Sequence, residues 1–190
     1  MVKLDVITTR GGDTGETSLG DGTRVRKDHA RVEALGAVDE ANAAVGMLRV
    51  QEGAAPHDAA LARISNDLFD LGADLSVPSD DPRARLRVTA APLARLEAEV
   101  AAMNEELPPL TSFVLPGGTA AGAAAHVART LARRAERAVV ALAAAEAVNP
   151  DAVRYLNRLS DHLFVLSRVL NAARDVLWVP GGADAGSGSS

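Results

Sequence analysis

The 190-residue sequence has no cysteine, few aromatic residues (3 %) and no excess of basic charge, its net charge being −5. Without cysteine there can be no disulfide, no thiolate nucleophile and no cysteine-ligated metal, which fits a reducing compartment. So few aromatic rings provide no stacking platform for single-stranded nucleic acid. An acidic balance also argues against broad nucleic-acid binding, which normally requires a basic surface.

The sequence also has no apolar run near the ~20 residues that a membrane-spanning helix needs. Its N-terminus does not contain the apolar core of a signal peptide. We therefore expect a cytoplasmic protein with neither membrane nor nucleic acid as a partner. The length favours one domain over residues 1–180, followed by a flexible Gly/Ser-rich tail at 181–190.

Five stretches place apolar residues three or four positions apart, as in amphipathic helices. They are residues 32–45, 61–75, 89–107, 119–148 and 150–174. Thr89, Thr119 and Asn149 are suitable N-caps, and Gly53 is a suitable stop for the first helix. The fourth stretch is rich in alanine, and we expect its buried stripe to consist of Val127, Leu131 and Leu142. The fold class predicted is all-α, a five-helix bundle.

Residues 9–22 combine five glycines with hydroxyls, acids and one arginine. Glycines permit close backbone approach, so successive N–H groups can converge on an anion, and Arg10 adds a fork suited to phosphate. This favours a polyphosphate-binding loop, and a flexible N-terminal arm is the alternative. The loop is not a Walker A motif, because no lysine follows its glycines at the required position.

The fourth stretch carries four arginines and no lysine within nine residues: Arg129, Arg133, Arg134 and Arg137. Arginine favours planar, bidentate recognition of phosphate or carboxylate. Positions 129, 133, 136 and 137 share one helical face. The alternative is a solvent-exposed face held by salt bridges.

Three further observations concern polar groups within helical stretches. Asn157 and Asp161 share a face beside a leucine stripe, where a plain helix–helix hydrogen bond is the alternative to a binding role. Asp39 and Glu40 interrupt an apolar pattern, so we expect a buried acid paired with an arginine of the fourth stretch. The four histidines have no metal-ligand spacing, and no nucleophile–base pair stands out.

Taken together, these motifs resemble the PduO-type ATP:cob(I)alamin adenosyltransferases, a family of corrinoid adenosyltransferases. The resemblance rests on the loop Thr9 to Ser18, the Ala37–Glu40 segment, Phe113 to Gly118, the arginine cluster and the Arg154–Asp161 run. It covers residues 3 to 178 in the order found in the family. Gly11 stands where threonine is common in the family, and Arg10 stands where lysine is common.

The resemblance implies a homotrimer with active sites between subunits. It also implies that the 5′-deoxyadenosyl group of ATP is transferred to the cobalt of cob(I)alamin, which yields adenosylcobalamin and triphosphate. Because the nucleophile is the cobalt itself, the protein supplies positioning and charge stabilisation. That division of work accounts for the missing side-chain nucleophile.

The resemblance also implies roles for individual residues. Arg133, Arg129 and Asp39 would be catalytic, with Arg129 paired to Asp39, and Phe113 would press on the corrin and displace the lower cobalt ligand. The ATP site would comprise Thr9, Arg10, Gly11, Gly12, Asp13, Gly15, Thr17, Ser18 and Lys27, completed by Arg133, Arg134, Glu136, Arg137 and Asn157.

Mg²⁺ is expected on the ATP phosphates, with no ligand cage of side chains. Expected protein partners are a cobalamin reductase and a B12-dependent acceptor enzyme, both in transient contact. Two other functions stay open at this point. One is a non-catalytic carrier of nucleotide or cobalamin, and the other is a helical interaction module.

Overall fold

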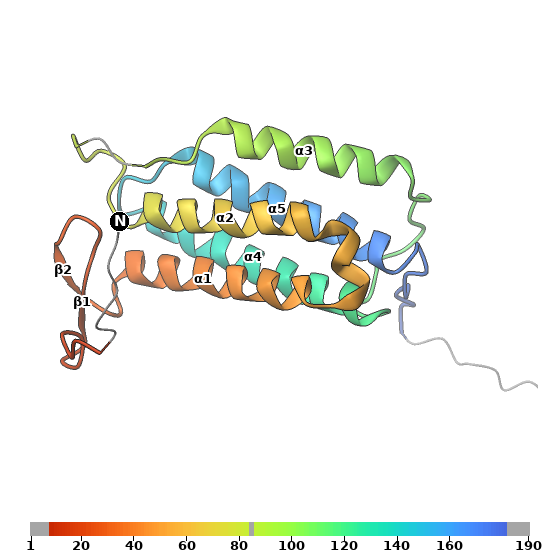
Figure 1. The fold of residues 1–190 in the computed structure, drawn as a ribbon, viewed down its shortest axis with the longest axis horizontal. Coiled ribbons are helices and arrows are strands. Elements are labelled where there is room, and N and C mark those ends of the chain that lie inside the picture. The colour runs from red at the N-terminus through yellow and green to blue at the C-terminus, as the bar shows by residue number, and fades with distance from the viewer. Residues whose placement is uncertain (1–7, 84–85, 182–190) are drawn as a thin grey trace, which may run out of the picture.

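The computed structural model describes residues 8–83 and 86–181. Within these residues the chain forms a short hairpin, one 3-10 helix and five α-helices (Figure 1). In order, the elements are β1 (Glu16–Ser18), β2 (Arg24–Arg26), α1 (Ala30–Arg49), η1 (Glu52–His57), α2 (Asp58–Leu75), α3 (Ala90–Glu105), α4 (Ala120–Ala143) and α5 (Pro150–Leu170). The all-α prediction is confirmed. Most of the predicted tail, residues 182–190, lies outside the described residues.

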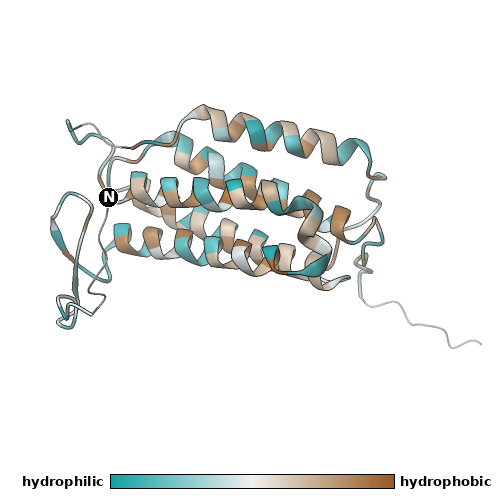
Figure 2. Cartoon of the chain, viewed as in Figure 1, coloured by the Kyte–Doolittle hydropathy of each residue, from teal (hydrophilic) through white to brown (hydrophobic). Residues whose placement is uncertain are grey.

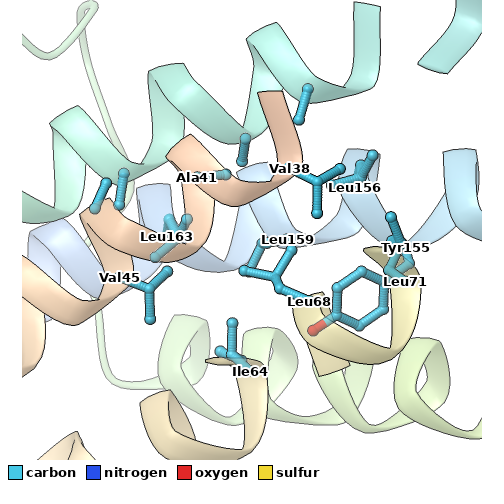
Figure 3. Close-up of a cluster of buried hydrophobic side chains, with 14 of the residues drawn as sticks. Val38, Ala41, Val45, Ile64, Leu68, Leu71, Tyr155, Leu156, Leu159 and Leu163 are labelled. Atoms are coloured by element: carbon cyan, nitrogen blue, oxygen red, sulfur yellow. The ribbon is translucent and has the colours of Figure 1, made fainter. Parts of the chain in front are cut away.

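The core lies where α1, α2, α4 and α5 meet. Helix α1 packs against α2 and α4, α4 packs against α5, and α3 packs on the outer side of α5. Figure 3 shows Val38 and Val45 of α1 facing Leu68 of α2 and Leu159 of α5. The leucine spacing that predicted α2 and α5 is therefore the spacing of their buried faces.

Helix α4 buries mostly alanines, and of the stripe that we expected Leu142 is fully buried and Leu131 partly buried against the core. Its buried face consists of Ala121, Ala125, Ala128, Ala132, Ala135, Val139 and Leu142. Val127 is 50 % exposed, so its assignment to the core was wrong. Small side chains let the backbones of α1 and α5 approach α4 closely, and a prediction that ranks residues by hydrophobicity misses such a face. Figure 2 shows the hydropathy along all five helices and the more polar hairpin.

The caps were predicted better than the C-terminal ends. The Thr119 hydroxyl accepts a hydrogen bond from Gly122 N, and the Asn149 side chain accepts one from Asp151 N. Thr89 stands at the N-cap of α3 but makes no capping bond there. Helices α4 and α5 end four or more residues before the predicted positions. Gly53 lies inside the unpredicted helix η1.

Two buried charged residues fix the end of the bundle that carries the hairpin. Arg31 is 1 % exposed, and its guanidinium lies 2.7 Å from Glu146 and donates to Leu75 O at 2.7 Å. These contacts tie the start of α1 to the ends of α2 and α4. Neither Arg31 nor Glu146 was singled out from the sequence.

Asp74, also 1 % exposed, organises the same end of the bundle. It accepts hydrogen bonds from Arg87 Nη1 (2.7 Å), Val88 N (2.7 Å) and Asn149 Nδ2 (2.6 Å). One carboxylate thereby joins α2, the segment before α3 and the start of α5. Two residues further on, Ser76 O accepts from Gly20 N at 3.0 Å, which attaches the hairpin to this end. A Cβ at Gly20 would collide with the Ser76 side chain.

Helix α3 is held mainly by polar contacts, since Leu96 is its one fully buried residue. Glu99 accepts from Arg63 Nη2 at 2.7 Å, and its other oxygen lies 2.9 Å from His162 Nε2. The hydrogen bond to His162 is the main cause that lowers the pKa of Glu99 to about 2, and Arg63 adds to it.

We expect Glu99 to make stability depend on pH in acid. Below pH 4.5 an unfolded glutamate takes up a proton, whereas the folded one stays charged to about pH 2. Stability from this group is therefore complete above pH 4.5 and is lost as the pH falls toward 2. Urea unfolding between pH 6 and 3 should show a loss of about 2 kcal/mol that Glu99→Gln abolishes. The exposed neighbour Glu97→Gln is the control, and parallel curves for wild type and Glu99→Gln would contradict the expectation.

No helix in the described ranges is long and apolar enough to cross a membrane.

Candidate active site

The hairpin folds the glycine-rich loop back onto Lys27. Strands β1 and β2 pair antiparallel with Thr17 opposite Val25. Before them the chain makes two tight turns, in which Asp13 N donates to Arg10 O and Gly15 N to Gly12 O, each at 3.2 Å. The loop therefore has the curled, exposed backbone that an anion-binding loop requires.

Lys27 lies directly over this loop. A Cβ added to Gly12 would stand 3.0 Å from Lys27 Nζ, so the lysine side chain lies close against the Gly12 backbone. The Lys27 N–H donates to Gly15 O at 2.9 Å and fixes the backbone at that point. Arg24, which the sequence did not single out, donates to Gly11 O at 2.9 Å. Arg24 thus adds a second cation to this loop. Its position could have been inferred only from the pairing of β1 with β2, which the sequence did not predict.

The positions predicted for the loop are mostly accessible. Those exposed to solvent are Thr9, Arg10, Gly11, Asp13, Gly15 and Ser18, while Gly12 and Thr17 are half-buried. Arg10 has φ of +58°, in the left-handed region that few side chains adopt. Such backbone geometry in a non-glycine residue is common at ligand-binding turns.

The arginines of α4 divide into two groups. Arg134 is bound to α1, at 2.6 Å from Glu40 and 2.8 Å from Glu33, and these two hydrogen bonds raise its pKa. The salt-bridged alternative is thus correct for Arg134 within one chain. Arg133 and Arg137 are exposed, and among the described residues the Arg133 guanidinium has no hydrogen bond or ion pair.

The polar groups of α5 are engaged within the same chain. Asn157 Nδ2 donates to Glu136 Oε1 at 2.9 Å, which is the helix–helix hydrogen bond given as the alternative. Asp161 accepts from Arg158 Nη1 at 2.5 Å. Asn157 and Glu136 are therefore adjacent, as a shared nucleotide site requires, and their mutual bond would have to open for either to contact a ligand.

Asp39 and Glu40 are exposed, so the expectation of a buried acid was wrong. The apolar residues on either side of them in α1 face the core, whereas these two adjacent residues lie on the exposed side of the helix. Asp39 lines a pocket of about 300 Å³ between α1 and α2, together with Phe69. Arg129 lines a different pocket, so one chain does not bring Asp39 and Arg129 together.

The second pocket, of about 730 Å³, contains Phe113. Its wall is formed by residues 110–114, Arg129, Phe164 and Trp178. Phe113 is 77 % exposed. Burial lowers the pKa of Arg129, and the nearby charge of Arg133 lowers it further. Arg129 Nε is buried without a hydrogen-bond partner among the described residues.

The hairpin and the Phe113 pocket lie at opposite ends of the bundle. Figure 1 shows β1 and β2 beside the start of α1, whereas the segment that joins α3 to α4 lies at the far end. Helix α4 runs between these ends and is about 36 Å long at 1.5 Å per residue, since it has 24 residues. One chain alone does not place Phe113 next to the hairpin.

The oxygen ligands near the hairpin suit a metal cation that is held mainly by phosphate. Mg²⁺ needs six oxygen ligands and usually retains waters and substrate oxygens. The loop offers the hydroxyls of Thr9, Thr17 and Ser18 and the carboxylate of Asp13. Over the described part of the chain, no group of three or more acidic or histidine side chains is placed to hold a metal. These residues fit a Mg²⁺ that arrives with ATP.

Comparison with known proteins supports the family resemblance. The family model for cobalamin adenosyltransferase matches residues 7–170. A cobalamin adenosyltransferase of Cupriavidus metallidurans is 50 % identical over 93 % of this chain and 95 % of its own. A corrinoid adenosyltransferase of Bacillus subtilis is 42 % identical over 87 % of this chain and 86 % of its own.

A solved structure has the same fold. It is a variant PduO-type ATP:corrinoid adenosyltransferase from Lactobacillus reuteri in complex with cobalamin and ATP. It is 36 % identical, covers 91 % of this chain and 99 % of its own, and has a TM-score of 0.87. The family resemblance drawn from the motifs is confirmed. The chain belongs to the cobalamin adenosyltransferase family, whose members are enzymes.

Proposed function

We infer that this protein transfers the 5′-deoxyadenosyl group of ATP to cob(I)alamin. The cobalt electron pair attacks the 5′ carbon, the bond from that carbon to the triphosphate oxygen breaks, and adenosylcobalamin and triphosphate are released. The observation that carries this inference is the glycine loop under Lys27, in a chain that also has a 730 Å³ aromatic pocket. The first suits a polyphosphate and the second a large apolar ring.

The hairpin would bind the triphosphate. The loop would offer its exposed backbone N–H groups, the hydroxyls of Thr9 and Ser18 and the Lys27 ammonium, which lies beside Gly12. Arg10 adds a guanidinium at the loop entry. As triphosphate leaves, negative charge develops on it, and fixed cations lower the energy of that state.

Arg133 would supply the remaining charge from α4. It is exposed and has no side-chain partner in the described part of the chain, and its charge lowers the pKa of Arg129. Two neighbouring guanidinium groups without a carboxylate between them attract an anion. Arg137, Glu136 and Asn157 lie one turn or one helix away and would contact the rest of the nucleotide.

We propose that a second subunit completes each site, in a homotrimer. The separation of the hairpin from the α3–α4 segment that carries Phe113 supports this arrangement, because a second chain would bring the two expected half-sites together. Among the described residues the Arg129 guanidinium has no carboxylate partner and Asp39 is exposed, so a salt bridge between them across a subunit boundary would pair both charges.

Phe113 would press against the corrin and keep the lower cobalt ligand displaced. Its 77 % exposure in the free chain is consistent with a ring that awaits an apolar partner. When Mg²⁺ is bound to the phosphates, it would neutralise part of their charge. Transient contacts with a cobalamin reductase and a B12-dependent acceptor, and a cytoplasmic location, complete the proposal.

The test is an anaerobic assay with reduced cobalamin, ATP, Mg²⁺ and the full chain, followed by the visible spectrum. We expect conversion to adenosylcobalamin with one triphosphate released per turnover. An unchanged Co(I) spectrum with an ATP-dependent rise in melting temperature would instead indicate a carrier. Neither a spectral change nor a thermal shift would leave only a helical module.

A further inference from the structure

Trp178 forms an exposed aromatic pair with Phe113. The ring centroids are 5.9 Å apart and the ring planes meet at 64°, an edge-to-face arrangement. Trp178 is 43 % exposed, and both rings line the 730 Å³ pocket. It is the only tryptophan in a chain that has few aromatic residues. Such a pair at a pocket wall is a surface for an apolar ligand.

Backbone hydrogen bonds hold Trp178 against the segment that carries Phe113. Trp178 N donates to Phe113 O at 2.7 Å, and Ser112 Oγ donates to Trp178 O at 2.7 Å. One step earlier, Leu115 N donates to Val176 O at 2.7 Å. Residues 176–178 thus run antiparallel to residues 112–115, like two short strands at the end of the bundle.

A buried ion pair anchors both segments to α5. Arg168 Nε donates to Asp175 Oδ2 at 2.8 Å, and the two side chains are 5 % and 4 % exposed. The same guanidinium donates through Nη2 to Pro108 O at 2.7 Å. One arginine therefore holds the segment before Trp178 and the segment before Phe113. These three anchors fix the backbone at Trp178, and the indole lies against Phe113.

We propose that Trp178 is a positioning residue of the corrinoid site, which fixes the direction in which the Phe113 ring faces the corrin and forms a second apolar wall. This inference rests on the proposed function. The indole lies on one side of Phe113 and limits the movement of the phenyl ring on that side. Edge-to-face contact favours one relative orientation of the two rings. A ring that acts by pressing on its ligand needs such a support behind it.

Because Trp178 is the only tryptophan, its fluorescence reports on this pocket alone. Titration of the full-length protein with cobalamin, which absorbs in the range of indole emission, should quench it in a saturable manner. Unquenched emission in a protein that turns over would overturn the proposal. Saturable quenching in a protein without turnover would refute the proposed reaction and leave the pocket assignment standing.

Variants separate positioning from packing. We expect Trp178→Ala to lower kcat about tenfold with a smaller change in the KM for ATP, and Trp178→Phe to recover most of the loss. The spectrum of Co(II)-cobalamin bound with ATP should lose its four-coordinate signature in Trp178→Ala alone. Val179→Ala, exposed and outside the pocket wall, is the matched control. Wild-type kcat and signature in Trp178→Ala would refute the role.

Discussion

Replacement of Arg133 by alanine is expected to lower kcat by about 100- to 1,000-fold, the loss typical of one electrostatic contact to a developing anion. Arg133 is exposed and its guanidinium makes no contact within the described residues, so its removal breaks no interaction of the free chain. The melting temperature should therefore not change. Charge on the departing triphosphate would lose one of its fixed partners.

The measurement compares kcat in the anaerobic assay with the quenching of Trp178 by cobalamin. Quenching should be preserved in Arg133→Ala, because Arg133 does not line the Phe113 pocket. Arg154→Ala is the matched control, since it removes an exposed arginine of α5 whose ion pair with Asp151 is worth little. Equal kcat values for Arg133→Ala and Arg154→Ala would refute the role of Arg133.

Asp74→Ala is expected to lower the free energy of unfolding by about 3–5 kcal/mol, as when one partner of a buried ion pair is removed. The change leaves Arg87, Val88 N and Asn149 without their common acceptor. It also loosens the end of α2, to which Gly20 attaches the hairpin. Loss of stability should therefore be accompanied by weaker ATP binding.

Urea unfolding of the full chain measures the first effect, and thermal stabilisation by ATP measures the second. Asp70→Ala, one turn earlier on α2, is the control, because Asp70 accepts a single long hydrogen bond within the described residues, from Asn66 at 3.5 Å. It should change stability by no more than about 0.5 kcal/mol. A loss equal to that of Asp70→Ala would show that the buried contacts of Asp74 are not the source of stability.

Local patterns predicted well wherever a local rule determines the structure. The leucines of α2 and α5 recur every three or four residues, and Asn149 followed by Pro150 predicts the start of α5. Composition singled out the glycine loop and spacing singled out the arginine cluster, and the binding role of each stays a prediction. Each of these features is decided within about ten residues of sequence.

Features that depend on distant segments were missed. The exposure of Asp39 and of Val127 depends on which face of α1 and α4 meets the other helices, and alanine-rich helices give no strong sign of it. Arg31 and Asp74 are buried because partners from distant segments surround them. Trp178 could have been noticed as the only tryptophan, but its contact with Phe113 comes from pairing of remote segments.

The contacts of Arg31 and Asp74 also determine when this end of the bundle can fold during synthesis. Arg31 bonds to Glu146, 115 residues later, and Asp74 bonds to Asn149, 75 residues later. A ribosome releases the N-terminal hairpin first, yet its support at the end of α2 is complete only after residue 149 has emerged. A nascent chain that stops before that point carries the glycine-rich loop without the structure that holds it in place.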